Sequence, residues 1–438
     1  MSAAWCVWVV VLVLIVLVWA SRNLEISRAR LEQRPLDERS YDGPPSDPPM
    51  VSVLIAAKDE EENIERAVRT MLAQDYPRFE LIVINDRSTD RTPAILERLA
   101  AEAKNAGKAD RLKVIHVERL RDGWFGKNNA MREGVQRAAG EWLCFSDADC
   151  RQISTRTLSL AMRHAVENGI DFLSVLPILE TRSFWERIIQ PVCGAVMVFW
   201  FHPKRVNDPK HPAAYANGAF MLMKRSTYDA IGGHEAVRTQ VNEDMHMARL
   251  AKERGQRLAV VQNDNLYSVR MYTGLRQIWR GWSRIFYGCF GSFRRLLISM
   301  AFLLVTNVLP YGSAAAAWAV VAARGWAQAG PWRPVAIAAT LAVAMQLITI
   351  ARFYRLSRVS PWLAPTFILG AVICIGMLVN AMFKLGGRTT TVWRGTAYRG
   401  DEVAASAPAV GTPGNAAGPD AQRPAPEASA SRPAAETV

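Results

Sequence analysis

The sequence has 438 residues, half of them hydrophobic, and a formal net charge of +13. This length accommodates a large domain plus further segments, and the hydrophobic fraction exceeds that of most soluble proteins. The basic residues are scattered and often border apolar blocks, which favours anionic lipid headgroups over nucleic acid as their partner. The six cysteines show no Cys-x-x-Cys spacing and no pairing with histidine, which argues against a zinc site or a disulfide framework.

The chain opens with an apolar block, Ala3 to Ala20, that contains no charged residue. Residues 1–24 are therefore predicted to be a transmembrane anchor. The block lacks a basic n-region and a small-residue cleavage site, so we expect the anchor to be retained. Arginines follow the block and none precedes it, which places the middle of the chain in the cytoplasm by the positive-inside rule. A multi-pass protein of the cell inner membrane is expected.

Residues 25–49 are predicted to be a linker, because they are charged at first and then rich in proline. From Met50 onward, short apolar runs alternate with amphipathic stretches, which predicts a mainly parallel sheet with helices on both faces. Strands are expected at Val51–Ala57, Leu81–Asn85, Leu112–Val117 and Trp142–Phe145. Helices are expected at Thr92–Ala106 and Lys127–Ala139.

Acidic residues follow three of these predicted strands: Glu60, Asp86, and the pair Asp147 and Asp149. One such residue is explained equally well as a helix cap. In an open α/β sheet, however, ligands bind beyond the carboxyl ends of the strands, and there the three acidic positions would meet. Two carboxylates one residue apart can hold a divalent cation, so we expect a metal-bound phosphate at this edge.

Three further apolar blocks predict a transmembrane region over residues 293–383: Leu296–Ala323, Val335–Ala351 and Trp362–Phe383. Pro310-Tyr311-Gly312 interrupts the first block, which is either one tilted span or a re-entrant hairpin. Arginines between the last two blocks and basic residues after them leave the side of the C-terminus open. Ile188–Phe201 is too short to span and is expected at the membrane surface. Residues 384–438 are predicted to be a basic segment followed by a disordered Ala/Pro-rich tail.

Several motifs in a fixed order resemble glycosyltransferase family 2 over residues 50–287. They are Val53–Ile64, Val83–Asp90, Gly126-Lys127, Asp147-Ala148-Asp149, Asn217–Phe220, Gly232–Glu235, Asn242–Asp244 and Gln277–Trp282. The resemblance implies a GT-A fold, a Rossmann-like α/β domain placed here at residues 50–292, between N- and C-terminal transmembrane helices. It also implies a UDP- or GDP-sugar donor and a Mg²⁺ or Mn²⁺ ion.

The same resemblance assigns roles by position. It places the donor nucleotide on Glu60 and Asp86, and the metal and diphosphate on Asp147 and Asp149. Asp244 corresponds to the catalytic base, with Glu243 beside it. The remaining matched positions are Lys127 at the phosphate and Asn217 and Gly218 on the acceptor side. Gln277, Arg280 and Trp282 approximate a Gln-x-x-Arg-Trp signature with Gly281 inserted, and the resemblance assigns them to the nucleotide-sugar site. The alternative is an interfacial helix with Trp279, Trp282 and Tyr287 as membrane anchors.

The chemistry of such a transfer agrees with these roles. Breaking the bond between sugar and phosphate leaves a nucleoside diphosphate, whose added negative charge a bound cation stabilises. An acceptor hydroxyl must lose a proton as it attacks, and a carboxylate within reach can accept it. As an alternative, the helix starting near Glu243 explains the acidic pair there as favourable charges at a helix N-terminus.

The leading hypothesis is therefore a membrane glycosyltransferase with a cytoplasmic catalytic domain that moves a sugar to a lipid or isoprenoid hydroxyl. It most resembles bacterial members linked to carotenoid, hopanoid and ceramide-type glycosylation. The alternative within the enzyme class is transfer to polyprenyl phosphate or to a growing polysaccharide. A catalytically inactive membrane scaffold is a weaker hypothesis, and a transporter is weaker still, because the C-terminal apolar blocks contain no ionisable residue.

Overall fold

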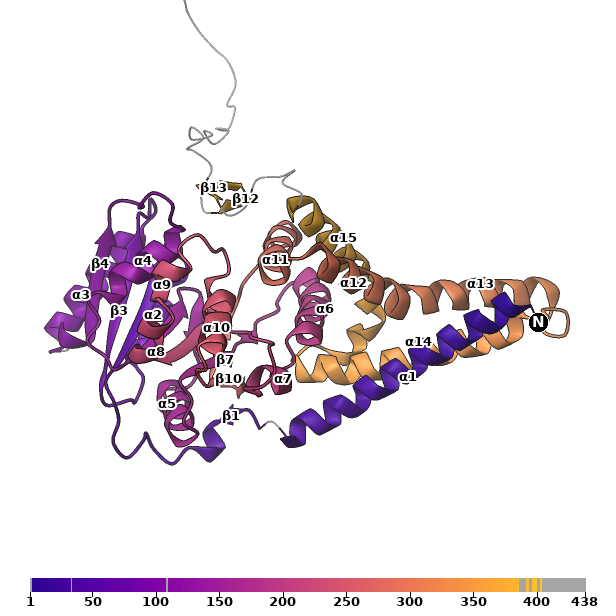
Figure 1. The fold of residues 1–438 in the computed structure, drawn as a ribbon, viewed down its shortest axis with the longest axis horizontal. Coiled ribbons are helices and arrows are strands. Elements are labelled where there is room, and N and C mark those ends of the chain that lie inside the picture. Colours follow the sequence, from indigo (N-terminus) through magenta and orange to yellow (C-terminus); the bar gives the residue numbers. More distant parts are fainter. Residues whose placement is uncertain are drawn as a thin grey trace, which may run out of the picture.

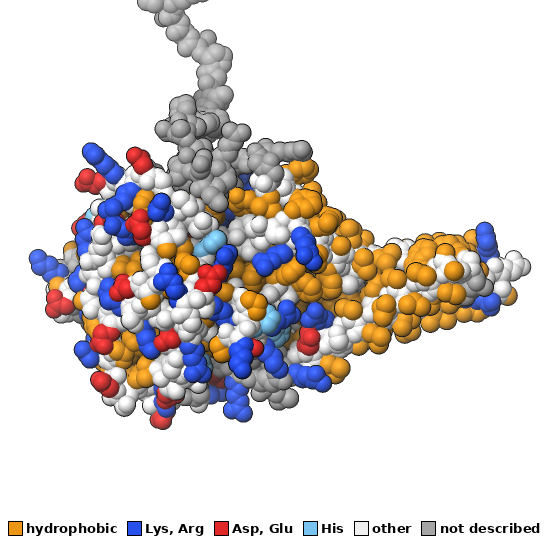
Figure 2. Space-filling model, in the orientation of Figure 1, with side chains coloured by type: hydrophobic (Ala, Val, Ile, Leu, Met, Phe, Trp, Pro, Cys, Tyr) orange, Lys and Arg blue, Asp and Glu red, His pale blue; other side chains and the backbone are white. Residues whose placement is uncertain are grey.

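The computed structural model describes residues 2–32, 34–107, 109–385, 391–393, 396–399 and 402–403. An α/β domain forms one end of the molecule, and a stalk of long helices forms the other (Figure 1). Hydrophobic side chains cover the stalk, whereas charged side chains cover the α/β domain (Figure 2). This division matches the expected split between a soluble domain and a membrane region.

The α/β domain is built on an eight-stranded sheet with the order β1-β10-β7-β9-β5-β2-β3-β4 within the described residues. Most neighbouring strands are parallel, but β9 runs antiparallel to both β5 and β7. Four of these strands were predicted from the sequence and are confirmed. The strands are β1 (Leu36–Asp37), β2 (Val51–Ala57), β3 (Phe79–Asp86), β4 (Leu112–Val117), β5 (Trp142–Asp147), β7 (Phe172–Leu176), β9 (Phe220–Lys224) and β10 (Leu258–Asp264).

Helices cover both faces of the sheet, and the apolar side chains that alternate between the two faces of β2 are buried beneath them. Val53 and Ile55 belong to one buried cluster with α2, α3 and α5, whereas Leu54 belongs to another with α4 and α10. Side chains at successive strand positions point to opposite faces, so both faces of β2 are buried. The helices are α2 (Ile64–Leu72), α3 (Thr92–Asn105), α4 (Gly126–Val135), α5 (Thr157–Glu167), α8 (Arg225–Ala230), α9 (Gly233–Ala236) and α10 (Glu243–Glu253). The predicted GT-A fold class is confirmed.

A small second sheet closes the domain where the chain leaves β5 and β10. Its strand order is β6-β11-β8, formed by β6 (Cys150–Gln152), β11 (Tyr267–Val269) and β8 (Ile178–Leu179). The segment expected as a linker, 25–49, is more regular than predicted. The first helix, α1 (Ala3–Glu32), continues into it, and β1 then pairs with β10 at the sheet edge. This short strand forms next to a proline-rich stretch because β10 offers the unpaired backbone groups of an edge strand, with which β1 pairs in parallel.

Among the described residues, four helices are long and apolar enough to cross a membrane. They are α1, the continuous helix Phe293–Arg324, α14 (Trp332–Leu356) and a helix over Pro361–Leu385 that contains α15 (Phe367–Leu385). The second of these comprises α12 (Phe293–Leu303), a π-helical turn (Leu304–Val308) and α13 (Leu309–Arg324). Pro310 lies in the first turn of α13, and the preceding π turn absorbs the irregularity. The hairpin alternative is therefore wrong.

Three of these helices lie side by side in the stalk, and buried polar contacts join them. The Gln346 amide donates to Asn307 Oδ1 at 2.9 Å, which links α14 to the π turn. Thr349 donates to the Trp19 carbonyl at 3.2 Å, which links α14 to α1. These bonds satisfy polar groups that lipid could not, and they explain the polar side chains in the apolar blocks.

The fourth apolar helix, α15, turns back from the stalk toward the α/β domain (Figure 1). Its main partners are α6 (Phe184–Trp200), α11 (Leu275–Phe290) and α12. Helix α6 contains the stretch predicted to rest on the membrane surface. A capping box of Ser183 and Glu186 starts it, and the buried Glu186 pairs with Arg270. Thus α6, α11 and α15 form the junction between the α/β domain and the stalk.

Beyond the junction, the described residues contain three short strands, β12 (Thr391–Trp393), β13 (Thr396–Arg399) and β14 (Glu402–Val403). A short helix, α7 (Pro203–Asn207), follows α6. The disordered tail predicted within 384–438 lies outside the described residues.

Candidate active site

A cavity of about 450 Å³ opens at the carboxyl ends of β2, β3 and β5. Because these strands are parallel neighbours in the sheet, the residues that follow them meet at one edge, as the sequence predicted. The walls include ten of the twelve predicted site residues: Glu60, Asp86, Lys127, Asp147, Asp149, Asn217, Gly218, Glu243, Asp244 and Trp282.

The β3 end of the cavity carries a tightly held carboxylate. Asp86 is 3% exposed, and the Arg87 guanidinium donates to both of its oxygens at 2.8 and 3.0 Å. Gly126 leaves the space beside it, because a Cβ there would lie 2.8 Å from Asp86 Oδ2. The neighbouring Glu60 is also buried and accepts a bond from the Asn63 amide at 3.0 Å. Both acidic groups are oriented before any ligand binds.

The β5 end carries the Asp-Ala-Asp triplet, and its two carboxylates have different surroundings. Asp147 Oδ1 accepts from Lys127 Nζ at 2.6 Å. Asp149 Oδ1 is buried and has no hydrogen-bond partner among the residues that the structure describes. Burial, together with the negative charges of Asp147 and Glu60, raises the pKa of Asp149 to about 7. A buried carboxylate oxygen without a partner is costly unless a ligand satisfies it.

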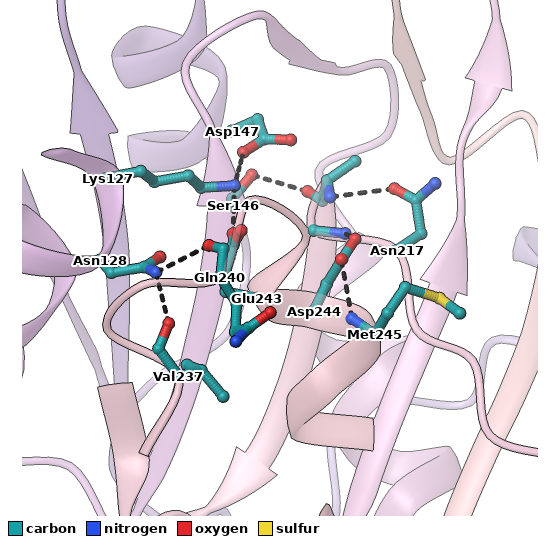
Figure 3. A network of polar contacts seen from close by, with 12 residues as sticks. Lys127, Asn128, Ser146, Asp147, Asn217, Val237, Gln240, Glu243, Asp244 and Met245 are labelled. Carbon is teal, nitrogen blue, oxygen red and sulfur yellow. Dashed lines mark hydrogen bonds and ion pairs between the residues drawn. The ribbon is translucent and has the colours of Figure 1, made fainter. Parts of the chain in front are cut away.

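Opposite the triplet, the first turn of α10 carries Glu243 and Asp244. Asp244 Oδ2 accepts from the backbone N–H of Gly218 at 2.9 Å, and its Oδ1 accepts from the N–H of Met245 at 2.7 Å (Figure 3). Burial, followed by the negative charge of Glu243, raises the pKa of Asp244 to about 7. The two backbone bonds orient a carboxylate whose proton affinity suits a general base near neutral pH.

Lys127 bridges the two acidic groups of the site. Its Nζ lies 2.6 Å from Asp147 Oδ1 and 2.7 Å from Glu243 Oε1 (Figure 3). Burial alone would lower the pKa of Lys127, but the two carboxylates outweigh burial and raise it well above its ordinary value. Lys127 is therefore charged and offsets part of the negative charge at the cavity floor.

The segment before α10 is fixed by Asn128, the residue after Lys127. Its buried side-chain amide donates to the carbonyl oxygens of Val237 and Gln240 at 2.7 and 3.0 Å (Figure 3). Gly218 approaches from the other side, where a Cβ would lie 3.1 Å from Lys127 Nζ and 3.5 Å from Asp244 Oδ2. The glycine predicted on the acceptor side thus leaves room between the lysine and the candidate base.

These residues fit a divalent metal that arrives with a phosphate ligand. Among the described residues, no group of three or more His, Cys, Asp or Glu side chains is arranged to hold a metal ion by itself. Mg²⁺ ordinarily takes one or two protein carboxylates and completes its shell with water and substrate phosphates. Asp149, with its buried oxygen, and Asp147 supply that number of ligands.

The structure separates the residues of the approximate Gln-x-x-Arg-Trp signature. Trp282 lines the cavity, but Gln277 and Arg280 are exposed and lie outside it. The Gln277 side chain instead accepts from the N–H of Thr273 at 2.9 Å. The expected grouping of Gln277 and Arg280 with the donor site is therefore not borne out by their positions. The cavity-lining residues of α11 are Trp282, Arg284, Ile285 and Cys289, and Gln277 and Arg280 precede them toward the N-terminus of the helix.

Tyr272 and Arg284 are among the cavity residues to which the sequence assigned no role. Arg284 follows Arg280 by four positions, so the string Arg-Gly-Trp-Ser-Arg offered two arginines, and the family spacing favoured Arg280, which lies outside the cavity. Gly281, the residue that departs from the signature, has a structural role. A Cβ at that position would overlap the ring of Tyr272, so glycine lets Tyr272 pack against α11 at the cavity wall.

Residues 52–232 match the family model described as glycosyl transferase family 2. This region is a glycosyl transferase family 2 domain. The match includes the strands β2, β3 and β5 and the acidic residues at their ends, and it confirms the family indicated by the motifs.

The chain is 26% identical over 239 residues to the 4,4'-diaponeurosporenoate glycosyltransferase of Staphylococcus aureus. That alignment covers 53% of this chain and 60% of the relative, so the chain matches less than two thirds of the length of this curated protein. Among solved structures, the chain is similar to a mannosyltransferase from Pyrobaculum calidifontis in complex with GDP-Man and Mn²⁺. The identity is 19%, the TM-score 0.49, and the coverage 78% of this chain and 99% of that one. Residues 1–349 of S. aureus TarS in complex with UDP-GlcNAc align with 15% identity, a TM-score of 0.36, and coverage of 80% and 95%.

Proposed function

We propose that the protein transfers a glycosyl group from a nucleotide-sugar donor to a lipid or isoprenoid acceptor at the cytoplasmic face of the cell inner membrane. The observation that carries this proposal is the composition of the cavity wall. The wall joins the acidic strand ends of a glycosyl transferase family 2 domain to α6 and α11, which pack in the same apolar cluster as the membrane helices. One cavity thus reaches both a polar donor and an apolar acceptor.

On the donor side, Glu60 and Asp86 hold the nucleoside, and Asp147 and Asp149 hold Mg²⁺ or Mn²⁺ on the diphosphate. The bound metal supplies positive charge at the diphosphate that leaves the sugar. Lys127 is charged and lies next to Asp147, so it adds a second positive group beside the diphosphate. Because these groups are fixed before the reaction, little reorganisation accompanies the development of charge.

On the acceptor side, Asp244 takes the proton of an attacking hydroxyl. Its two backbone hydrogen bonds fix the carboxylate, and burial, followed by the negative charge of Glu243, raises its affinity for the proton. Attack from this side, opposite the departing diphosphate, would proceed with inversion at the anomeric carbon. Asn217 and Gly218 border the acceptor's path.

A carboxylate acceptor is the second candidate, and it is favoured by the S. aureus relative, whose name refers to a carotenoid acid. A carboxylate attacks without losing a proton, and the same holds for polyprenyl phosphate. Such acceptors would make Asp244 dispensable as a base, so the effect of substituting it separates them from a hydroxyl acceptor.

Membranes that contain the full-length protein provide the direct test. They are incubated with Mg²⁺ and a panel of labelled UDP- and GDP-sugars, and the lipids are then extracted. We expect label from one donor to enter the organic phase, and none with the Asp149→Asn variant. Label that stays wholly in the aqueous phase with every donor would contradict the proposal.

We further propose that three helices cross the membrane and that α15 lies at its cytoplasmic surface. The support is the packing of α15 against α6, α11 and α12 at the junction instead of alongside α13 and α14 in the stalk. This arrangement keeps Arg352, Arg355 and Lys384 on one side, so both groups of basic residues obey the positive-inside rule.

A reporter fused after residue 438 is therefore expected to lie on the same side as the catalytic domain. Alkaline phosphatase, active only outside the cytoplasm, should be inactive there, and green fluorescent protein should fluoresce. Fusions within the 325–331 loop, between α13 and α14, should give the opposite result and serve as the control. An active phosphatase at the C-terminus would mean that α15 is a fourth span.

A further inference from the structure

The cavity has an apolar lobe in addition to its acidic floor. Two helices face each other across this lobe, and each contributes a stripe of side chains. Residues Gly194, Met197, Val198 and Phe201 follow one face of α6 and its C-terminal end, and Trp282, Ile285 and Cys289 follow one face of α11. The donor-binding carboxylates need no such walls, because a nucleotide sugar and its metal are polar.

The lobe is open where α6 carries its glycine. A Cβ on Gly194 would meet no neighbouring atom within 4 Å. Two other helical glycines of the junction are closely covered, since a Cβ on Gly370 of α15 would overlap the Ile188 carbonyl, and one on Gly281 would overlap Tyr272. Gly194 is therefore not required by helix packing, and in a helix interior it costs about 0.5–1 kcal/mol relative to alanine. A glycine that lowers the stability of the helix while leaving open space beside it indicates that this space has a function.

The lobe opens toward the membrane helices. Val198, one turn after Gly194, lines the cavity and is nevertheless 46% exposed. The next residue, Phe199, stacks on Phe302 of α12 and lies under the guanidinium of Arg22, at the cytoplasmic end of the apolar part of α1. The mouth of the lobe thus lies where the stalk meets the α/β domain, at the level of the bilayer surface.

The inner end of the lobe offers a hydrogen-bond donor. Trp282 is 5% exposed and lines the cavity, and its indole N–H has no partner among the residues that the structure describes. A buried indole N–H ordinarily has a partner. An occupant with an apolar chain and one polar end would satisfy it.

We propose that this lobe binds the apolar chain of the acceptor, that the chain enters from the bilayer past Val198, and that Gly194 is the residue that leaves room for it. The occupant is a linear isoprenoid or acyl chain with a single polar end that reaches Trp282 and the carboxylates. The inference rests on the proposed function for the identity of the occupant as an acceptor. The binding itself can be tested separately.

The test uses full-length protein in vesicles of phosphatidylethanolamine and phosphatidylglycerol, with a farnesol analogue that carries a photoreactive diazirine as the probe. After illumination, labelled peptides are located by mass spectrometry. In the unmodified protein, we expect label on α6 and α11 that excess unlabelled farnesol displaces. In Gly194→Phe, whose ring fills the lobe, labelling of these helices should fall at least tenfold.

Two variants control for effects on folding. Gly194→Ala adds a methyl group in open space and should retain labelling, and it should also raise the thermal stability. Gly312→Phe places the same ring at an exposed position of α13 with open space around it, and it should label like the unmodified protein. All variants should bind UDP or GDP, whichever the unmodified protein binds, with unchanged affinity by calorimetry.

The outcomes separate this inference from the proposed function. Undiminished labelling of α6 and α11 in Gly194→Phe, or label confined to α1, α13 and α14 in the unmodified protein, would overturn the inference. Loss of nucleotide binding in Gly194→Phe would show that the ring disturbs the fold, and Gly194→Leu, which fills less of the lobe, would then decide by the same criterion. If labelling behaves as expected but no donor yields a glycosylated lipid, the result supports binding of an apolar chain in the lobe and contradicts the proposed function.

Discussion

Replacing Asp149 with asparagine is expected to lower glycosyl transfer by about a thousandfold, because the metal on the leaving diphosphate contributes several kcal/mol to the transition state. The variant keeps the shape of the side chain and removes its charge. Asp149 is singled out because its buried Oδ1 has no partner among the described residues, whereas Asp147 is already engaged by Lys127. The rate of nucleoside diphosphate release, measured across a Mg²⁺ or Mn²⁺ titration, is the readout.

Asp229→Asn is the matched control, since Asp229 is an exposed residue of α8 on the same domain. It should leave the rate and its metal dependence unchanged. Removing the charge of Asp149 also removes the burial cost of a carboxylate with a raised pKa, so the Asn variant should be at least as stable thermally as the unmodified protein. Full activity of Asp149→Asn at every metal concentration would rule out the metal role.

Replacing Asp244 with asparagine is expected to lower kcat by about 10² to 10⁴ for a hydroxyl acceptor, the usual contribution of a general base. The KM for the donor should change little, because the donor groups lie on the other side of the sugar. An equal loss in kcat and kcat/KM for the acceptor would indicate an interaction made in the transition state. Activity that survives the substitution would instead favour an acceptor that is already ionised, a carboxylate or a phosphate.

The pH profile provides a second readout of the same residue. A base must be deprotonated to act, and the pKa of Asp244 is raised to about 7. Activity of the unmodified protein should therefore rise as the pH increases through about 7, with metal held at saturation so that Asp149 stays ionised. The residual activity of Asp244→Asn should lack this rise. A profile that is flat from pH 5.5 to 8.5 in the unmodified protein would argue against Asp244 as the base.

The parts of the fold that follow from local patterns were predictable from the sequence. The run Val51–Ala57 is apolar apart from Ser52 and is followed by charged residues, so both bounds of β2 were correct. The antiparallel β9 was not predicted, because its place between β5 and β7 depends on contacts between strands distant in the sequence. The edge strand β1 was also missed, since pairing with β10 determines it and its own residues do not.

The candidate site also has residues whose positions were predictable from the sequence and residues whose positions were not. Asp86 and Asp147 end strands and Asp149 lies two residues beyond β5, so their convergence followed from the topology of a parallel sheet. The positions of Gln277 and Arg280 depend on which part of α11 lies against the cavity, and the sequence motif does not specify that. The orientation of α15 could not be predicted from its sequence either. Its sequence is as apolar as that of the other candidate spans, and its proposed place at the membrane surface rests on its packing against α6 and α11.

The attachment of α6 and α11 to the apolar cluster of the stalk fixes the cavity relative to the candidate membrane helices. For the proposed reaction, the acceptor then never has to leave the lipid phase, and encounter takes place in two dimensions. The rate should follow the mole fraction of acceptor in the membrane and not its amount per volume of suspension. Diluting the acceptor with inert phospholipid would slow the reaction, whereas diluting the vesicles with buffer would not.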